Sequence, residues 1–365
     1  MTNERIKRVC KQFQFQGTLR KGFPYGSGHI NDTYKVETIE EDKFDYILQR
    51  VNHHVFKDVP GLMENVERVT SHIRKKMEGI EGINPDREVL TVIPTGDGSS
   101  YYKDDDGNYW RMYIFIWDNR SYDQVDSPEK AYEGGSMFGK FQALLADLPG
   151  KPLNETIPNF HNIEWRLDTF EEILARNPVG RANEISDEIK FVRDRAEEMK
   201  TILNLGRKGL IPQRITHNDT KFNNVLLDQN DKGLCVIDLD TVMPGYVHYD
   251  FGDSIRTSTN TAAEDEADLS RVEMDIKLFE AYARGFLEHT KDTLNEAEID
   301  HLAFSGKLLP YMIGLRFLTD FVDGDNYFKT KHEKHNLQRA RAQFKLLQSM
   351  ERQFEEMKAI IEGLK

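Results

Sequence analysis

One stretch of the sequence carries oxygen-bearing side chains at spacings suited to phosphate and metal chemistry. Asp219 and Asn224 lie in a polar loop, and Asp238 follows the second of two short apolar runs. These runs, 225–227 and 234–237, are separated by polar residues and a glycine, a pattern that predicts a β-hairpin. The hairpin would bring the three side chains to one end of a small ribbon. Carboxylate and amide oxygens of this kind suit Mg²⁺, which takes few protein ligands and completes its shell with substrate phosphates.

The spacing of these residues resembles the catalytic loop and metal-binding aspartate of protein-kinase-like phosphotransferases. The sequences His-Asn-Asp-Thr-Lys-Phe-Asn-Asn at 217–224 and Val-Ile-Asp-Leu-Asp at 236–240 are similar to the aminoglycoside and choline kinase branch. The resemblance implies that Asp219 is the catalytic base and that His217 braces its loop. It also implies ATP as the phosphoryl donor and a Mg²⁺ or Mn²⁺ ion held by Asn224 and Asp238.

A segment after the metal strand resembles the family element that anchors the catalytic loop by hydrogen bonds. It reads Asp-Phe-Gly-Asp at 250–253. The resemblance implies structural support as the role of Asp250.

Further segments resemble the bacterial N-acetylhexosamine 1-kinases, and that likeness runs over essentially the whole chain. They are the Gly-Ser-Gly-His-Ile-Asn loop at 26–31, the catalytic loop, and the pair 314–321 and 324–329. The resemblance implies that four residues meet the sugar: His29, Asp240, Arg316 and Tyr327. For Arg316 a plain alternative is a helix arginine paired with Asp320, four residues later.

A glycine-rich turn lies upstream, between two strand-like runs, and it is formed by Gly26, Ser27 and Gly28. Backbone without side chains can approach phosphates closely and point its amide groups at them. Its position before the next strand is where a kinase fold places the loop that covers the phosphates. We therefore expect these residues to contact the nucleotide.

The next strand, 44–51, is where a kinase carries a cation for the nucleotide phosphates, usually lysine. This sequence has no lysine inside that strand, so Arg50 is the candidate and Gln49 the alternative. Successive residues face opposite sides of a strand, so a one-residue shift decides between them. The helical pattern that follows, 59–79, offers Glu64 or Glu67 as a partner for the cation, and the sequence leaves that choice open.

Two further strands are expected at 88–94 and 109–117, and the acidic segment 104–108 between them reads as a hairpin turn. The second strand leads into a hinge in which Phe115 would pack against adenine. Ser127 and Pro128 then predict the start of a helix, with a serine cap and a proline at the first position.

The expected fold class is α+β, with two lobes as in protein kinases. A chain of 365 residues exceeds the ~250–300 residues that one core serves. Residues 1–118 would form a nucleotide-binding lobe with a small antiparallel sheet, and residues 119–365 a catalytic, substrate-binding helical lobe. The helical pattern at 166–205 is strongly charged and predicts a solvated outer face. Apolar stripes at helical spacing fall within 274–289, 299–321 and 337–364, and the last of these is expected to pack in the core and not to form a coiled-coil seam.

Composition excludes several classes of partner. A formal net charge of −13 disfavours nucleic acid and anionic membrane surfaces. No apolar stretch reaches the roughly 18 residues of a membrane span. The only cysteines, Cys10 and Cys235, imply no disulfide framework, so we expect a cytoplasmic protein. We also expect a monomer or weak homodimer.

These observations favour a kinase that transfers the γ-phosphoryl group of ATP to the anomeric 1-hydroxyl of an N-acetylhexosamine. A second interpretation keeps the chemistry but takes choline, homoserine or an aminoglycoside as acceptor. A third is a nucleotide-binding module without catalysis. The sequence does not settle the hexosamine epimer or the choice of ATP over GTP.

Overall fold

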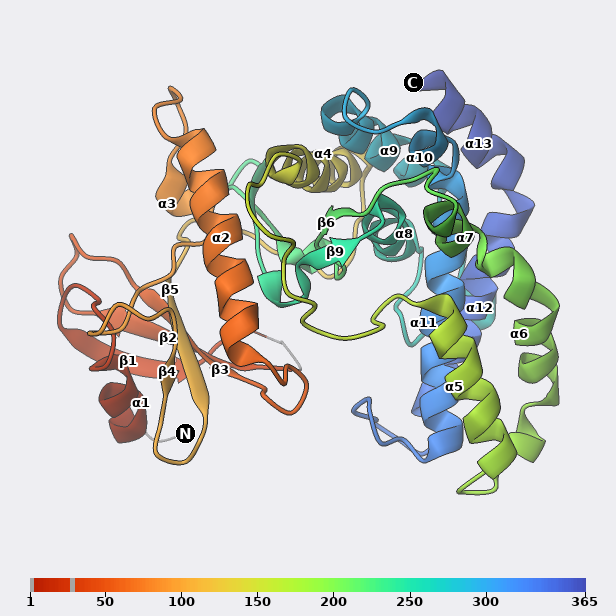
Figure 1. The fold of residues 1–365 in the computed structure, drawn as a ribbon, viewed down its shortest axis with the longest axis horizontal. Helices are drawn as coiled ribbons and strands as arrows, with labels where there is room; N and C mark the ends of the chain where they lie inside the picture. The colour runs from red at the N-terminus through yellow and green to blue at the C-terminus, as the bar shows by residue number, and fades with distance from the viewer. Residues whose placement is uncertain (1–2, 27–29) are drawn as a thin grey trace.

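The small lobe is built on an antiparallel sheet of five strands in the order β1-β2-β3-β5-β4. The computed structural model describes residues 3–26 and 30–365, and Figure 1 shows the sheet on one side and the helical lobe on the other. This confirms the predicted α+β, two-lobed fold. The strands are β1 (Leu19–Pro24), β2 (Asp32–Thr38), β3 (Tyr46–Val51), β4 (Tyr102–Lys103) and β5 (Tyr109–Ile114).

The two faces of this sheet have different neighbours. Tyr46 and Leu48 of β3 belong to a small core that also contains Ile6 and Val9 of α1 (Asn3–Cys10). Val51, on the other face, belongs to the large core that continues into the helical lobe. Side chains alternate along a strand, so every second residue of β3 faces the large lobe.

Two helices follow the first three strands. The helix α2 (Val59–Met77) lies between the sheet and the large lobe (Figure 1). Its Asn65 is fully buried and donates to the backbone oxygens of Asn154 (2.7 Å) and Val242 (3.0 Å), which fixes the helix to the large lobe. A buried amide needs such partners because an unpaired polar group in the interior is costly.

The predicted strand at 88–94 was wrong. Asn84 caps a short helix, α3 (Pro85–Glu88), with proline at its first position, and Val92 makes only an isolated bridge with Tyr113. Proline fixes its backbone at a helical φ and favours the start of this helix, which takes Glu88 from the predicted strand. The rest of the segment meets β5 through two hydrogen bonds, from Ile93 N–H to Met112 O (2.8 Å) and from Ile114 N–H to Thr91 O (3.0 Å). The acidic segment does form the predicted turn, because Asp104 N–H donates to Asn108 O (2.9 Å) between β4 and β5.

The large lobe consists mostly of helices. Ser127 caps α4 by accepting from Lys130 N–H, which confirms the predicted helix start. The helices are α4 (Pro128–Leu145), α5 (Ile163–Arg176), α6 (Ser186–Met199), α7 (Thr201–Arg207), α8 (Val247–Ser258), α9 (Ile276–Thr290), α10 (Glu296–Asp300), α11 (Leu302–Asp323), α12 (His335–Arg352) and α13 (Phe354–Gly363).

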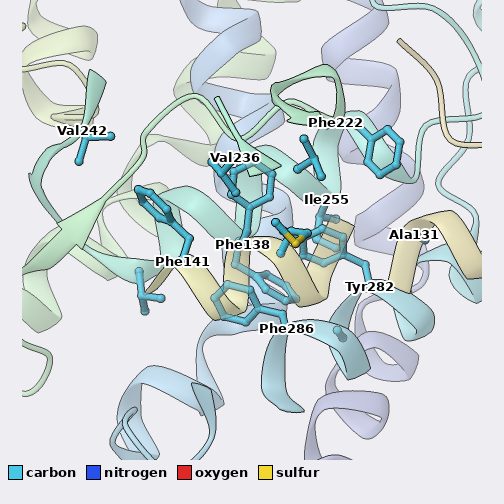
Figure 2. Packing of buried hydrophobic residues seen from close by; sticks show 14 of the residues in the cluster. Ala131, Phe138, Phe141, Phe222, Val236, Val242, Ile255, Tyr282 and Phe286 are labelled. Atoms are coloured by element: carbon cyan, nitrogen blue, oxygen red, sulfur yellow. The ribbon is translucent and has the colours of Figure 1, made fainter. Parts of the chain in front are cut away.

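Helices α4 and α9 approach closely because glycines face each other. A Cβ on Gly135 would lie 2.1 Å from Tyr282 O, and one on Gly285 would lie 2.2 Å from Tyr132 O. Figure 2 shows Phe138 and Phe141 of α4 gathered with Tyr282, Phe286 and residues of the hairpin region such as Val236. The hairpin region therefore rests on a closely packed helix pair.

Two short ribbons lie between α7 and α8 in chain order. Strand β6 (Arg214–Thr216) pairs with β9 (Met243–Gly245), and β7 (Val225–Leu227) pairs with β8 (Gly233–Val236). The β7–β8 pair confirms the predicted hairpin. The short 3₁₀ turns η2 (Phe222–Asn224) and η3 (Leu239–Thr241) flank it.

The long C-terminal apolar stripe forms two helices, α12 and α13, which separate at Gln353. Most of its residues are buried, which confirms that the stripe packs into the core. No helix within the described residues is long and apolar enough to cross a lipid bilayer.

Candidate active site

The buried carboxylate of Asp250 fixes the loop that follows β6. Asp250 of α8 accepts hydrogen bonds from the backbone N–H groups of His217 (2.8 Å) and Asn218 (2.7 Å). The side chain of Gln142 donates to the same carboxylate at 2.6 Å. Burial raises the pKa of Asp250 to about 6, against the lowering effect of these donors and of His217. Such multiple bonds fix the backbone of the loop.

His217 joins this loop to the strand that precedes Asp238. Its Nε2 contacts Ile237 O at 2.9 Å, and its Nδ1 accepts from Asp219 N–H at 3.3 Å. The ring lies edge-on against Phe138 and Phe141. These contacts require a proton on Nε2 and a lone pair on Nδ1, so the ring braces both segments.

Asp219 lies at the tip of the loop with a lysine beside it. Its Oδ1 is 3.0 Å from Lys221 Nζ, and its side chain keeps 24% of its surface exposed. Burial acts to raise the pKa of Asp219, but nearby cations, chiefly Lys221, outweigh burial and hold the pKa below its usual value. Asp219 is therefore an ionised carboxylate that solvent and a bound hydroxyl can reach.

Asn224 and Asp238 are the residues expected to hold magnesium. The Nδ2 of Asn224 donates to Asp219 O (2.8 Å), which leaves its Oδ1 as the atom available to a cation. Asp238 adopts a left-handed backbone with φ of 61°, and its carboxylate has no hydrogen bond or ion pair with any described residue. Burial, then Asp240 and Asp219, raise the pKa of Asp238 to about 7. This unpaired carboxylate among other acids fits a bound cation.

No three His, Cys, Asp or Glu side chains within residues 3–26 and 30–365 are grouped so that they could hold a metal alone. Magnesium bound by one carboxylate and one amide oxygen needs no such group, since nucleotide phosphates and water fill its shell.

Asp240 lies two residues beyond Asp238 but is buried. Its Oδ1 forms an ion pair with Nη1 of Arg111 on β5, and its Oδ2 accepts from Asn31 Nδ2 at 2.7 Å. Only 3% of its side chain and 1% of that of Arg111 is exposed. Both oxygens are thus engaged by other side chains. The sugar contact expected for Asp240 would have to share an oxygen with one of these partners, and it stays a prediction.

The strand β3 turns Gln49, not Arg50, toward the large lobe. Gln49 pairs in register with Thr33 of β2 and Arg111 of β5. Arg50 lies on the outer face and forms an exposed pair with Asp32. The structure therefore does not bring Arg50 to the phosphate side. The strand's twofold side-chain alternation explains the difference.

Neither glutamate of α2 forms an ion pair with a residue of β3 in the described part of the chain. Glu64 pairs with Lys151 at 2.9 Å and accepts from Asn154. The residue of α2 that meets Arg111 is Met63, whose Sδ lies 3.9 Å from Nη1.

The hinge end of the sheet carries an aromatic and cationic cluster. Phe115 follows β5, and the ring of Tyr25 meets it edge-on with centroids 5.6 Å apart. Lys35 Nζ lies 4.0 Å from the centre of the Phe115 ring. Gly26 has a φ of 78°, a conformation that glycine adopts readily. The predicted contacts of Ser27, Gly28 and His29 fall outside the described residues.

Arg316 of α11 lies among aromatic rings near the catalytic loop. Its guanidinium is 5.0 Å from the ring centre of Phe160, 5.5 Å from that of Phe328 and 5.8 Å from that of Tyr327. It is not paired with Asp320, which instead accepts from the backbone N–H groups of residues 327 and 328. Tyr327 is 58% exposed, so its hydroxyl is open to a ligand.

A second arginine lies close to the first. Burial, then the charge of Arg316, lower the pKa of Arg166 to about 9. Arg166 Nη2 donates to Phe160 O (2.9 Å), while its Nε is buried without a hydrogen-bond partner among the described atoms. Neither arginine forms an ion pair with a carboxylate in the described part of the chain. Two cations held this close favour an uncharged or anionic ligand over a cationic one.

His161 connects the arginines to the catalytic loop. Its Nε2 contacts Asn218 O at 3.0 Å, and burial lowers its pKa to about 3, so it is neutral. Its ring lies 4.6 Å from that of Phe160.

Four residues of this site were missed from the sequence: Arg111, His161, Arg166 and Lys221. Of these four, only Lys221 could have been found from the sequence, because it is a cation two residues after the candidate base. The others come from segments that are distant in sequence.

Comparisons with known proteins place this geometry in context. Residues 23–287 match the family described as the phosphotransferase enzyme family. An aminoglycoside phosphotransferase from Alicyclobacillus acidocaldarius is 11% identical, with a TM-score of 0.58 over 98% of this chain and 94% of that one. A choline kinase from Cryptosporidium parvum is 14% identical, with a TM-score of 0.58 over 99% and 98% of the two chains. An amicoumacin kinase, solved with AMP-PNP and Ca²⁺, is 13% identical, with a TM-score of 0.59 over 97% and 92%.

Proposed function

The chain belongs to the phosphotransferase enzyme family, and from that premise we propose that it transfers the γ-phosphoryl group of ATP to the anomeric hydroxyl of an N-acetylhexosamine. The family and the fold make it a small-molecule phosphotransferase. The donor and the acceptor are the proposed part. The relatives with the same fold include a kinase solved with a nucleotide analogue and a divalent cation, which supports ATP and a metal ion.

In this proposal Asp219 Oδ1 or Oδ2 accepts the proton of the sugar hydroxyl as the oxygen attacks the γ-phosphorus. The bond from the γ-phosphorus to the bridging oxygen breaks, and ADP leaves. Its lowered pKa keeps it ionised, and its loop is fixed by Asp250 and His217. Asn224 Oδ1 and the Asp238 carboxylate would hold Mg²⁺, which when bound neutralises charge on the phosphates. Lys221, 3.0 Å from Asp219, adds positive charge where the transferred group develops negative charge.

The observation that carries the acceptor assignment is the arginine pair beside His161. A quaternary ammonium or amino acceptor would meet the like charges of Arg166 and Arg316, which opposes choline and aminoglycosides. A neutral acetamido sugar presents hydroxyl and carbonyl oxygens that arginine and the Tyr327 hydroxyl can pair with. Such a site rejects analogues that lack those groups, because its own donors are then left unpaired.

The experiment is an ADP-release assay with Mg²⁺-ATP and a panel of acceptors. N-acetylglucosamine or N-acetylgalactosamine should be phosphorylated, and their 1-deoxy analogues should not. Choline, ethanolamine and an aminoglycoside should give no release above the ATP background. Turnover of choline alone would overturn the acceptor and leave the phosphotransferase standing.

A further inference from the structure

We propose that Arg111 of β5 binds the phosphates of the nucleotide donor and takes the place of the lysine that kinases carry on the third strand. The inference rests on the proposed function, since it assumes a nucleoside triphosphate as donor. It adds a binding residue that neither the catalytic motif nor its spacing indicates.

The residue of β3 that faces the large lobe carries no charge. Gln49 occupies the position that faces the large lobe, with Val51 of the same face in the core shared by the two lobes. Its amide is neutral and is already shared, since Nε2 donates to Thr33 Oγ1 at 3.0 Å and Oε1 accepts from Arg111. A neutral amide cannot balance phosphate charge, so the face needs a cation from another strand.

The guanidinium of Arg111 lies between Gln49 and the turn that carries Asp238. Arg111 lies directly opposite Gln49 in the β3–β5 register, and its Nε donates to Gln49 Oε1 at 3.0 Å. The guanidinium therefore lies at the end of the Gln49 side chain, in contact with its amide oxygen. The Nη1 group pairs with Asp240, which places the same cation beside the turn that carries Asp238.

The guanidinium of Arg111 keeps N–H donors that no described residue uses. Arginine has five N–H donors in a planar fork. Nε donates to Gln49, and Nη1 donates to Asp240 and Met63 Sδ, whereas Nη2 has no hydrogen-bond partner among the residues described. A guanidinium with a free edge next to a metal-binding turn is suited to phosphate oxygens, which it can bind in pairs.

The carboxylate of Asp240 holds the Arg111 guanidinium in place. In kinases a helix glutamate orients the strand lysine. Here α2 presents Met63 to Arg111, and Glu64 is engaged by Lys151. Asp240 therefore replaces the helix glutamate as the partner of the cation. This arrangement ties β5 directly to the metal turn through a buried ion pair between the lobes.

Lys35 is the competing cation on this sheet face. It pairs with Asp45 at 3.1 Å and lies over the ring of Phe115, at the hinge end of the sheet. That position is next to the expected adenine, so Lys35 is not beside Asp238. Of the two, Arg111 alone contacts the turn that would carry the metal.

The test measures the affinities of ATP and adenosine by titration calorimetry in the presence of MgCl₂. Removing Arg111 alone leaves Asp240 as an unpaired buried carboxylate, so the comparison is made in an Asp240→Asn background. Adding Arg111→Met to that background should weaken ATP binding by about 10- to 100-fold, because a charge-assisted contact is lost. Adenosine binding should change by less than about twofold, since adenosine has no phosphate.

Two further variants sharpen the result. Gln49→Lys, added to the same pair of changes, should restore a severalfold preference for ATP, because it returns a cation to the same sheet face. The matched control is Arg20→Met, an exposed arginine of β1, which should leave both affinities unchanged.

An unchanged ratio of ATP to adenosine affinity after Arg111→Met would overturn the inference, as would an equal loss for both ligands or a failure of Gln49→Lys to restore the ratio. If the unaltered protein itself binds ATP no better than adenosine, the proposed donor fails, and the inference fails with it. If the unaltered protein prefers ATP and the Arg111 variants keep that preference, only the inference fails.

Discussion

The catalytic loop and the acceptor side meet at His161, yet they are held in place in different ways. The loop is fixed by buried hydrogen bonds from its backbone to Asp250 and from His217 to Ile237. On the acceptor side, Arg316 contacts the faces of aromatic rings, and Tyr327 is largely exposed. Hydrogen bonds fix atoms in direction and distance, whereas stacking on rings leaves a guanidinium freer to turn.

The difference separates two requirements of the proposed reaction. Proton transfer needs the base within hydrogen-bond reach of the hydroxyl, so its supports must be rigid. Recognition of the acceptor uses side chains that can differ without disturbing that loop. Changes in the loop should therefore lower turnover or stability, and changes on the acceptor side should act mainly on the sugar KM.

The largest effect is expected for Asp219→Asn. The change removes the proposed base while keeping the shape of the side chain, so kcat should fall by a factor on the order of 10² or more. The melting temperature and nucleotide affinity should stay close to those of the unaltered protein. Asp228→Asn, in the turn of the adjacent hairpin, is the control and should retain activity. A near-normal turnover in Asp219→Asn would show that another group is the base.

The next effect concerns the metal. Activity should require Mg²⁺ or Mn²⁺ and disappear with excess EDTA. In Asn224→Ala and Asp238→Ala the metal concentration at half-maximal activity should rise by roughly 10-fold or more, because each change removes an oxygen ligand. Asn230→Ala, in the hairpin turn, serves as the control. An unaltered metal titration in both ligand variants would disprove the site.

Asp250→Ala tests the support of the loop rather than its chemistry. It leaves the buried N–H groups of His217 and Asn218 without acceptors, at a cost of about 1–3 kcal/mol for each unpaired group. Urea unfolding should show a lower midpoint, with a lower kcat at temperatures where the protein remains folded. Unchanged stability would mean that the loop is held elsewhere.

The smallest effect is expected on the acceptor side. Arg316→Ala should raise the sugar KM by about 10-fold, since one hydrogen-bonding group is lost, and should leave the ATP KM alone. Arg341→Ala, an exposed arginine paired with Glu188, is the control. If Arg316→Ala lowered kcat and left the sugar KM unchanged, the division between the two regions would not hold.

The catalytic loop could be predicted because its residues are close in sequence and its hairpin is local. The β7–β8 pair, the helix start at Ser127 and the two-lobed fold were all predicted from apolar periodicity, turn residues and family resemblance. The strand expected at 88–94 was wrong because its first residue, Glu88, ends α3, and the rest of the segment meets β5 only around Val92.

The remaining residues of the site depend on tertiary packing. The role of Arg111 follows from its register opposite Gln49, and Asp240 is some 130 positions away in the chain. The sequence of one strand does not reveal which of its faces turns toward the large lobe, so it favours Arg50 where the structure turns Gln49 inward. Arg166 meets Arg316 only because α5 packs on α11.

The most direct test of the proposed function is ¹H–³¹P NMR of the product formed from N-acetylglucosamine or N-acetylgalactosamine and ATP. The account predicts a single new phosphate resonance that is coupled to the anomeric proton of the sugar, together with one equivalent of ADP. A phosphate coupled to the protons at carbon 6, or the absence of any sugar phosphate while another acceptor is converted, would contradict the assignment of the anomeric hydroxyl as acceptor.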